Sequence, residues 1–274
     1  MRTSSPGPAA RGDRADCGSC FGLCCVALPF IASADFARDK ASGDPCGNLG
    51  TDFRCGIHAR LRNSGYQGCT VYDCFGAGQQ VSQETFGGRD WRAAPETARD
   101  MFDAFPVVRH LRELLWYLTD ALARDAARPL HKKLRALVAE VEALTRLDPA
   151  GLARVDVGAQ REKVNALLLR TSELVRAPVR GRKKDRRGAD LMGARLRGAD
   201  LRGVSLRGAY LIAADLTGAD LREADLIGAD LRDAELSGAD LRGSLFLTQM
   251  QVNAARGDTA TGLPPALDRP AHWS

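Results

Sequence analysis

The sequence predicts a mixed fold with three parts in order: a cysteine-rich metal-binding module, an α-helical segment, and a coil built from five-residue repeats. Three observations predict this fold. All eight cysteines lie between Cys17 and Cys74, apolar residues keep helical spacing through the middle third, and a period of five fills residues 189–248. The chain of 274 residues is 45% hydrophobic and 27% charged, which is the composition of folded domains rather than of a disordered chain.

Changes in composition along the chain give the expected boundaries. We expect a disordered tail over residues 1–15, the metal-binding module over 16–88, a helical bundle or extension over 89–178, a basic linker over 179–187, the repeat over 188–248, and a helical cap and tail over 249–274. The net charge of +5 resides in the middle third, because residues 86–185 carry 20 basic and 14 acidic side chains. Phosphate binding needs basic groups gathered on one surface, so the sequence favours a solvated linker and disfavours a nucleic-acid partner.

The repeat begins at Ala189 and runs through twelve consecutive units of five residues to Thr248. The third position of a unit is leucine eleven times and then Phe246, and the first position is alanine ten times. A period of five matches neither a helix nor a simple strand. The chain must therefore turn a corner once per unit and point both apolar residues inward, so that four corners close a square turn of 20 residues.

This pattern resembles the pentapeptide-repeat family, A(D/N)LXX, over about 60 residues. The resemblance implies a right-handed quadrilateral β-helix, a β-solenoid of about three coils. Aspartates and arginines 20 residues apart would then stack in adjoining outward columns and form a solvated ion-pair grid: Asp200, Asp220 and Asp240 beside Arg202, Arg222 and Arg242. Family members that inhibit DNA gyrase imitate acidic duplex DNA, whereas residues 186–248 carry nine arginines against ten acidic residues, so we do not expect such mimicry.

The cysteines form the second motif, with four thiols in the first nine residues of the cluster and four more downstream: Cys17, Cys20, Cys24, Cys25, Cys46, Cys55, Cys69 and Cys74. Thiolates two or three residues apart can converge on one ion. Four suffice for one tetrahedral zinc, so eight allow two sites or one site with spare thiols. We predict that these cysteines bind zinc or iron, including an iron–sulfur cluster, with His58 as an additional candidate ligand.

This segment resembles the zinc- or iron-chelating family named for its CxxCxxCC motif. The first four cysteines match the motif that gives the family its name, and the later elements match Cys46 with Leu49, Cys55-Gly-Ile-His58, and Cys69 with Cys74. Three residues instead of two separate Cys20 from Cys24, and four separate Cys69 from Cys74. The assignment of ligands and the identity of the metal therefore stay open at the level of sequence.

Two other interpretations of the cysteines are four disulfides in an exported protein and eight reduced structural thiols. A segment from Phe21 to Ala32 imitates a secretory signal, but Asp13 and Asp16 lie in its leader and Pro29 interrupts it. We therefore expect the cytoplasm, where thiols stay reduced. No apolar run reaches the length of a membrane span, so no membrane association is expected.

The middle third predicts three or four helices, broken at Pro129 and at Asp148-Pro149 and ending before Pro178. After the repeat, Thr248 is expected to N-cap a short helix through Arg256, with Gly257 in the C′ position. Outward apolar residues of the repeat are expected to be covered by the helical segment or by a partner: Met192, Ile212, Ile227, Leu245 and Leu247.

The predicted function is that of a metal-stabilised protein-interaction or scaffold protein, because a repeat coil displays surfaces. Neither part shows an acid, a base and a nucleophile together, so no catalytic residue is predicted. We expect a protein partner, but the sequence does not identify it. The alternative is an iron–sulfur or zinc-dependent redox enzyme whose chemistry resides among Cys17 to Cys74.

Overall fold

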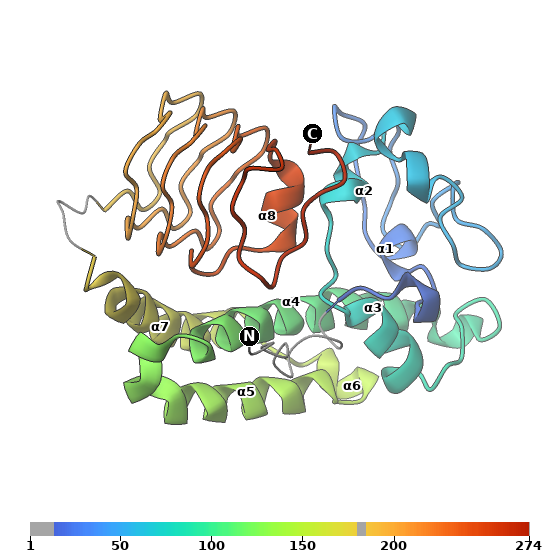
Figure 1. Ribbon diagram of the computed structural model, residues 1–274. Coiled ribbons are helices and arrows are strands. Elements are labelled where there is room, and N and C mark those ends of the chain that lie inside the picture. Colours follow the sequence, from blue (N-terminus) through green and yellow to red (C-terminus); the bar gives the residue numbers. More distant parts are fainter. Residues whose placement is uncertain (1–13, 180–184, 274) are drawn as a thin grey trace, which may run out of the picture. The chain divides into compact units, whose positions relative to one another are not determined.

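The computed structural model describes residues 14–179 and 185–273 (Figure 1). Most of the expected tail at residues 1–15 and of the basic linker at 179–187 lies outside the described residues. Two compact units form, and the helical segment contributes to both. The first comprises residues 14–119 and 135–164, and the second comprises residues 120–134 and 165–273.

The structure confirms that the middle region is helical, and it places short helices in the N-terminal region as well. The α-helices are α1 (Leu23–Val26), α2 (Gln67–Val71), α3 (Ala77–Gln79), α4 (Ala98–Leu122), α5 (His131–Thr145), α6 (Pro149–Leu152), α7 (Val157–Arg176) and α8 (Gln249–Ala254). Short 3-10 turns lie at Cys17–Ser19, His58–Arg60, Arg62–Ser64, Pro95–Thr97 and Asp125–Leu130, and a π-turn at Gln80–Thr85. None of the helices in the described part of the chain has the length and apolar character needed to cross a bilayer.

Helix α4 begins earlier than the leucine spacing indicates and continues through Pro106. Proline removes one backbone donor and strains the preceding turn. The helix persists because its N-terminal half buries Met101, Phe105 and Val108 completely in the core of the first unit. That core also holds Leu23 and Val81, so it joins α4 to the cysteine-rich segment.

In the second unit, parallel backbone bridges join residues 20 positions apart, from Asp185–Ser205 to Asp225–Leu245. Tyr210 illustrates the ladder: its carbonyl accepts from Leu191 N–H at 2.8 Å and its N–H donates to the Ala189 carbonyl at 2.9 Å. The bridges are isolated, and no extended strand forms among the described residues. The chain thus coils with a 20-residue register that begins at Asp185.

Packing in this coil follows the five-residue pattern. From Leu201 to Leu241 the third-position leucines are at most 4% exposed. At the fifth position the backbone takes positive φ, which glycine adopts without steric cost. Ala213, Glu223 and Asp233 occupy the same corner with φ of 54–58°, a conformation that an L-residue adopts at a cost of about 1–2 kcal/mol.

The C-terminal segment closes one end of the coil. Thr248 caps α8 in a capping box with Gln251, as expected. The helix ends at Ala254, so the expected extension to Arg256 is wrong, because Arg256 leaves the helix to form a bridge with Glu235. The expectation that Gly257 is a left-handed C′ residue is also wrong, because its φ is not positive. Glycine is favoured at this position because a Cβ would lie 2.7 Å from the ring of Trp273.

Helical residues of the second unit cover part of the coil. The Asp120 carboxylate accepts a hydrogen bond from Phe246 N–H at 2.9 Å, and the Arg124 guanidinium donates to the Ser244 carbonyl at 2.8 Å. Leu245 and Leu247 are buried, which agrees with the expectation that they are covered. Met192, on the first turn of the coil, is 58% exposed, so the helical segment does not cover it, and the expectation of cover by a partner stays a prediction there.

Candidate metal centre

All eight cysteines lie in the first unit as free thiols, so the interpretation as four disulfides is not supported by the structure. Cys24 and Cys25 sit on α1, and Cys69 sits on α2. Cys17 opens a 3-10 turn that Asp16 caps through Gly18 N–H at 2.8 Å. The fold therefore gathers thiols from four separate segments around one very short helix.

The first thiol group comprises Cys17, Cys20, Cys24 and Cys74. Three of its members, Cys20, Cys24 and Cys74, pack against the same apolar core. Gly78 shows how close two of the sulfurs are, because a Cβ on it would lie 2.7 Å from Cys20 Sγ and 3.9 Å from Cys74 Sγ. Burial, followed by repulsion from Cys74 and then from Cys25, raises the pKa of Cys17. Cys17 thus lies near Cys74 of this group and also near Cys25.

The second thiol group comprises Cys25, Cys46, Cys55 and Cys69. Cys46 is buried with Leu61 and Tyr66, and Cys25 and Cys55 pack against this cluster. Backbone bonds hold the loops in register, since Cys46 N–H donates to the Cys25 carbonyl at 2.9 Å and Cys55 pairs with Leu49. Burial and then repulsion from the other three thiols of the group raise the pKa of Cys69 to about 12.

Burial keeps most of these thiols protonated when no cation is present. It raises the pKa of Cys20 to about 11 and raises the pKa values of Cys55 and Cys74 above the ordinary value. Cys25 differs, because the hydrogen bond it shares with Cys24 lowers its pKa, and the positive charge of Lys40 acts in the same direction. A metal ion would replace these protons when the thiols bind it.

The side chains do not yet enclose an ion. No three histidine, cysteine or carboxylate side chains of the described residues come together closely enough to hold one in their present positions. His58 is exposed on its 3-10 turn. The thiols therefore have the composition of metal ligands, but their side chains do not form a coordination shell in these positions.

Buried donors beside each group fit thiolate ligands. The hydroxyls of Tyr66 and Tyr72 and the amide nitrogen of Asn48 are buried without a hydrogen-bond partner among the described residues. Tyr66 packs with the second thiol group, and Tyr72 packs against the same core as the first. A thiolate sulfur accepts hydrogen bonds, so metal-bound thiolates would give these donors partners that neutral thiols do not supply well.

Known proteins resemble this chain in both halves. The pentapeptide-repeat family matches residues 187–208 and 209–246 in eight copies. Over 262 residues, 94% of each chain, the sequence is 62% identical to the uncharacterized protein YybG of Bacillus subtilis (strain 168). The chain belongs to the family of YybG and is a pentapeptide-repeat protein.

A solved pentapeptide-repeat structure also matches part of the chain. It is HetL, involved in heterocyst differentiation regulation in the cyanobacterium Nostoc sp. strain PCC 7120. The match is 32% identical with a TM-score of 0.12, and it covers 29% of this chain and 45% of HetL. The chain therefore spans less than half of that protein's length.

The outward face of the pentapeptide repeats carries the expected ion-pair grid. Arg222 shows its geometry, with 2.6 Å to Asp220 on its own turn and 3.6 Å to Asp240 on the next. Arg202 pairs in the same way with Asp200 at 2.7 Å and with Asp220 at 3.6 Å. Because each carboxylate in these columns lies beside a guanidinium, the columns carry no continuous negative charge.

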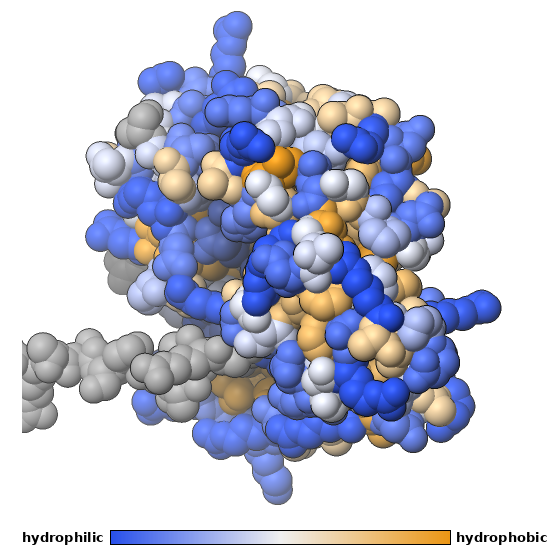
Figure 2. Space-filling model, turned by 90° about the vertical axis from the view of Figure 1, so that its right-hand side faces the viewer, coloured by the Kyte–Doolittle hydropathy of each residue, from blue (hydrophilic) through white to orange (hydrophobic). Residues whose placement is uncertain are grey.

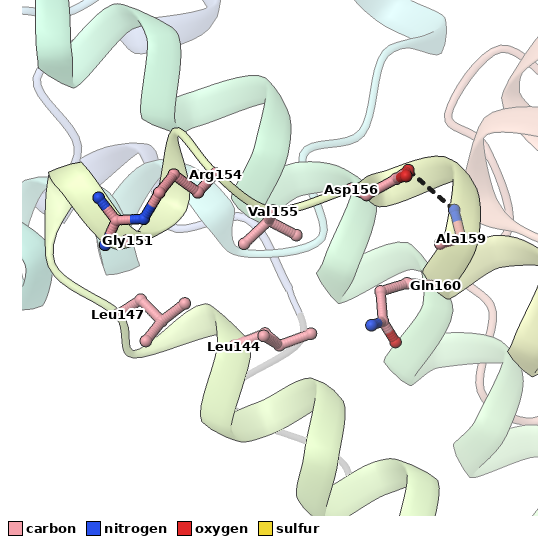
Figure 3. Close-up of a pocket in the computed structure, with 8 residues that line it drawn as sticks. All are labelled: Leu144, Leu147, Gly151, Arg154, Val155, Asp156, Ala159 and Gln160. Atoms are coloured by element: carbon pink, nitrogen blue, oxygen red, sulfur yellow. Dashed lines mark hydrogen bonds between the residues drawn. The ribbon is translucent and has the colours of Figure 1, made fainter.

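Sequence reasoning missed Lys40, which lies near the second thiol group. Lys40 and Cys46 line one cavity of about 370 Å³, together with Arg38 and Asp44. A cavity of the same volume in the first unit contains no cysteine and lies between α5, α6 and α7 (Figure 3). In this second cavity the Asp156 carboxylate accepts a hydrogen bond from Ala159 N–H at 2.9 Å, and the rest of the cavity wall is mainly apolar.

The surface view in Figure 2 shows a mainly hydrophilic face on which apolar residues form separate patches. This face carries no single continuous apolar surface of the kind that marks a large hydrophobic interface.

Proposed function

We propose that the cysteine-rich segment binds metal, zinc or iron, in two sites of four thiolates each. The supporting observation is the division of the eight thiols into the first and second thiol groups. Four thiolates are the complete ligand set of a tetrahedral zinc or of an iron–sulfur cluster, and soft thiolates suit both. The resemblance to the CxxCxxCC family supports the same assignment.

Metal bound there would stabilise loops that have little secondary structure of their own. The segment from Cys25 to Cys69 contains only short 3-10 turns between α1 and α2, so turn and loop hydrogen bonds hold it instead of a continuous helix or sheet. A bound zinc supplies crosslinks between loops, and an iron–sulfur cluster supplies crosslinks and can carry an electron. Reduced thiols are required in either case, which supports our proposal of a cytoplasmic location.

We further propose that the pentapeptide repeats form a right-handed quadrilateral β-helix that serves as a protein-interaction surface. The 20-residue register, the inward leucines and the left-handed corners support this proposal. The paired charges of the outward columns favour a protein partner over gyrase-type imitation of DNA. The role of the whole chain would then be that of a metal-stabilised scaffold.

A redox enzyme is the second candidate. Cys17 and Cys69, one in each thiol group, are exposed, so a cluster held there would be accessible to solvent and to small redox partners. Reversible loss of visible absorption on reduction would favour this candidate, whereas colourless protein that contains zinc would favour the scaffold.

The decisive experiment is elemental analysis of protein purified without oxygen, together with acid-labile sulfide and the visible spectrum. We expect two zinc ions, or two iron–sulfur clusters, per chain. Metal-free protein whose cysteines are linked as disulfides would contradict the proposal.

Variants then assign the two sites. Cys20→Ser and Cys46→Ser should each remove one of the two metal centres, and the double variant should remove both. His58→Ala is the matched control and should keep both, because four thiols already complete each set. Loss of both centres from either single variant would indicate one shared site and contradict the division into two groups.

A further inference from the structure

Lys40 is a buried ammonium in the loop that follows α1. The residue is 9% exposed, and its Nζ donates to three backbone carbonyls: Val26 at 3.0 Å, Ala41 at 2.9 Å and Asp44 at 2.9 Å. The ammonium also lies 5.5 Å from the centre of the Phe30 ring. All three N–H donors are thus used, so the position of the charge is fixed.

The groups in direct contact with this charge are neutral, because carbonyl oxygens accept all three of its hydrogen bonds. The Asp44 carboxylate is a charged neighbour that lines the same cavity. Burying a cation is costly, so negative groups nearby favour a lysine in this place, and Asp44 is one such group. Burial accordingly lowers the pKa of Lys40, while Cys46, Asp44 and Cys25 oppose that shift when they are ionised.

Geometry ties the ammonium to the second thiol group. Two of its three acceptors lie beside that group in the chain, since Val26 follows Cys25 and Asp44 precedes Cys46 by two residues. The carbonyl of Cys25 in turn receives the N–H of Cys46 at 2.9 Å. Lys40 and Cys46 also line the same cavity. The first thiol group has Arg54 instead, an exposed side chain whose guanidinium donates to the Gly18 carbonyl.

We propose that Lys40 is the fixed counter-charge of the second thiol group and selectively strengthens metal binding there. The inference rests on the proposed metal-binding function. Four thiolates around a divalent ion leave two negative charges in excess, and a desolvated ammonium held close to them offsets part of that excess. Lys40 is a positioning residue here, because its effect reaches the metal through the thiolates.

The test is titration of reduced, metal-free protein with Zn²⁺ in competition with a chromophoric chelator. For Lys40→Met we expect one ion to bind with the affinity seen in the unmodified protein. The second ion should bind with an affinity lower by a factor of about ten or more, which is the usual loss when a group that supports metal ligands is removed. Lys40→Arg keeps the charge but presents it with a different geometry, so it should bind the second ion more tightly than Lys40→Met does. Lys133→Met, on an exposed turn of α5, is the matched control and should change neither.

The retained ion reports that the variant is folded, so weakening of the second ion alone cannot result from general unfolding. Lys40→Met that binds both ions with unchanged affinity would overturn the inference. Loss of both ions would also overturn it, because Lys40 would then support the whole segment. Weak binding by Lys40→Arg equal to that of Lys40→Met would show that the charge is not what matters. If the unmodified protein binds no Zn²⁺, both the proposed function and this inference are overturned.

Discussion

Cys24 and Cys25 are adjacent in the chain with their Sγ atoms 4.0 Å apart, and yet they belong to different thiol groups. Cys24 faces the core that holds Cys20 and Cys74, whereas Cys25 packs against Cys46 and Cys55. Successive residues of a helix point about 100° apart, so neighbouring cysteines on α1 can pack against different clusters, as the two sites that we propose require.

Gly78→Ala should remove the metal that we propose for the first thiol group. The new Cβ would lie 2.7 Å from Cys20 Sγ, a separation that real side chains do not tolerate, so the sulfur must move. We expect a loss of about 1–3 kcal/mol in the free energy of unfolding and loss of one metal ion. Gly56→Ala is the control, because its Cβ would meet the Asn48 carbonyl oxygen at an ordinary 3.6 Å. Unchanged metal content in Gly78→Ala would argue against the first site.

Asp225→Asn should destabilise the pentapeptide repeats strongly. Asp225 is fully buried and pairs with Arg207 at 2.8 Å, while Arg207 also donates to Asn165 on α7. Removing the carboxylate charge leaves a buried guanidinium poorly compensated, which costs about 3–5 kcal/mol in unfolding free energy. Asp200→Asn changes the same repeat position in an exposed pair and should have a small effect. Chemical denaturation followed by circular dichroism measures both, and equal effects would contradict the prediction.

Glu223→Gly should stabilise the repeats slightly. Glu223 occupies a corner with φ of 58°, a conformation that costs an L-residue about 1–2 kcal/mol. Glycine avoids this cost, but part of the gain is lost because glycine makes the unfolded chain more flexible. We expect a net increase of about 0.5–1 kcal/mol in the free energy of unfolding. Gly228→Ala makes the opposite change at an equivalent corner with φ of 65° and should destabilise by a similar amount. A melting temperature that falls in Glu223→Gly would refute this reading of the corner.

Acid should destabilise the repeats over a defined range of pH. The hydrogen bond from Arg202 lowers the pKa of Asp200 from 3.8 to about 2, and the equivalent arginines lower the pKa values of Asp220 and Asp240. A carboxyl group with a lower pKa in the folded state contributes stability that is complete above its unfolded value and is lost as pH falls through its folded value. Stability should therefore decline from about pH 4 toward about pH 2.

Thermal unfolding at a series of pH values measures this decline. Replacing Arg202, Arg222 and Arg242 by glutamine removes the hydrogen bonds that lower these pKa values. The triple variant should accordingly lose part of its pH dependence over this range, because Thr217 and Arg232 still lower the pKa values of Asp215 and Asp230. A variant that retains the pH dependence of the original protein would show that other carboxylates cause it.

Local pattern determined much of the repeat region. The period of five predicted the 20-residue register, and the third-position leucines predicted the interior, because each depends on contacts that recur at a fixed spacing. Thr248 predicted the start of α8 for a similar reason, since capping involves residues within one turn. The helical spacing of the middle third also identified α4, α5 and α7, although the start of α4 required the buried contacts of Met101 and Phe105.

In the cysteine-rich segment, by contrast, the tertiary structure decided what the sequence left open. Its composition predicted thiols able to bind metal, but which thiols come together was decided by tertiary structure. Cys25 meets Cys46 across a loop of 20 intervening residues, and Cys20 meets Cys74 across 53, separations at which spacing carries no information about contact. The sequence did not predict a role for Lys40 for the same reason. Its neighbours in the chain form no motif, and only the fold encloses its ammonium among three carbonyls beside the second thiol group.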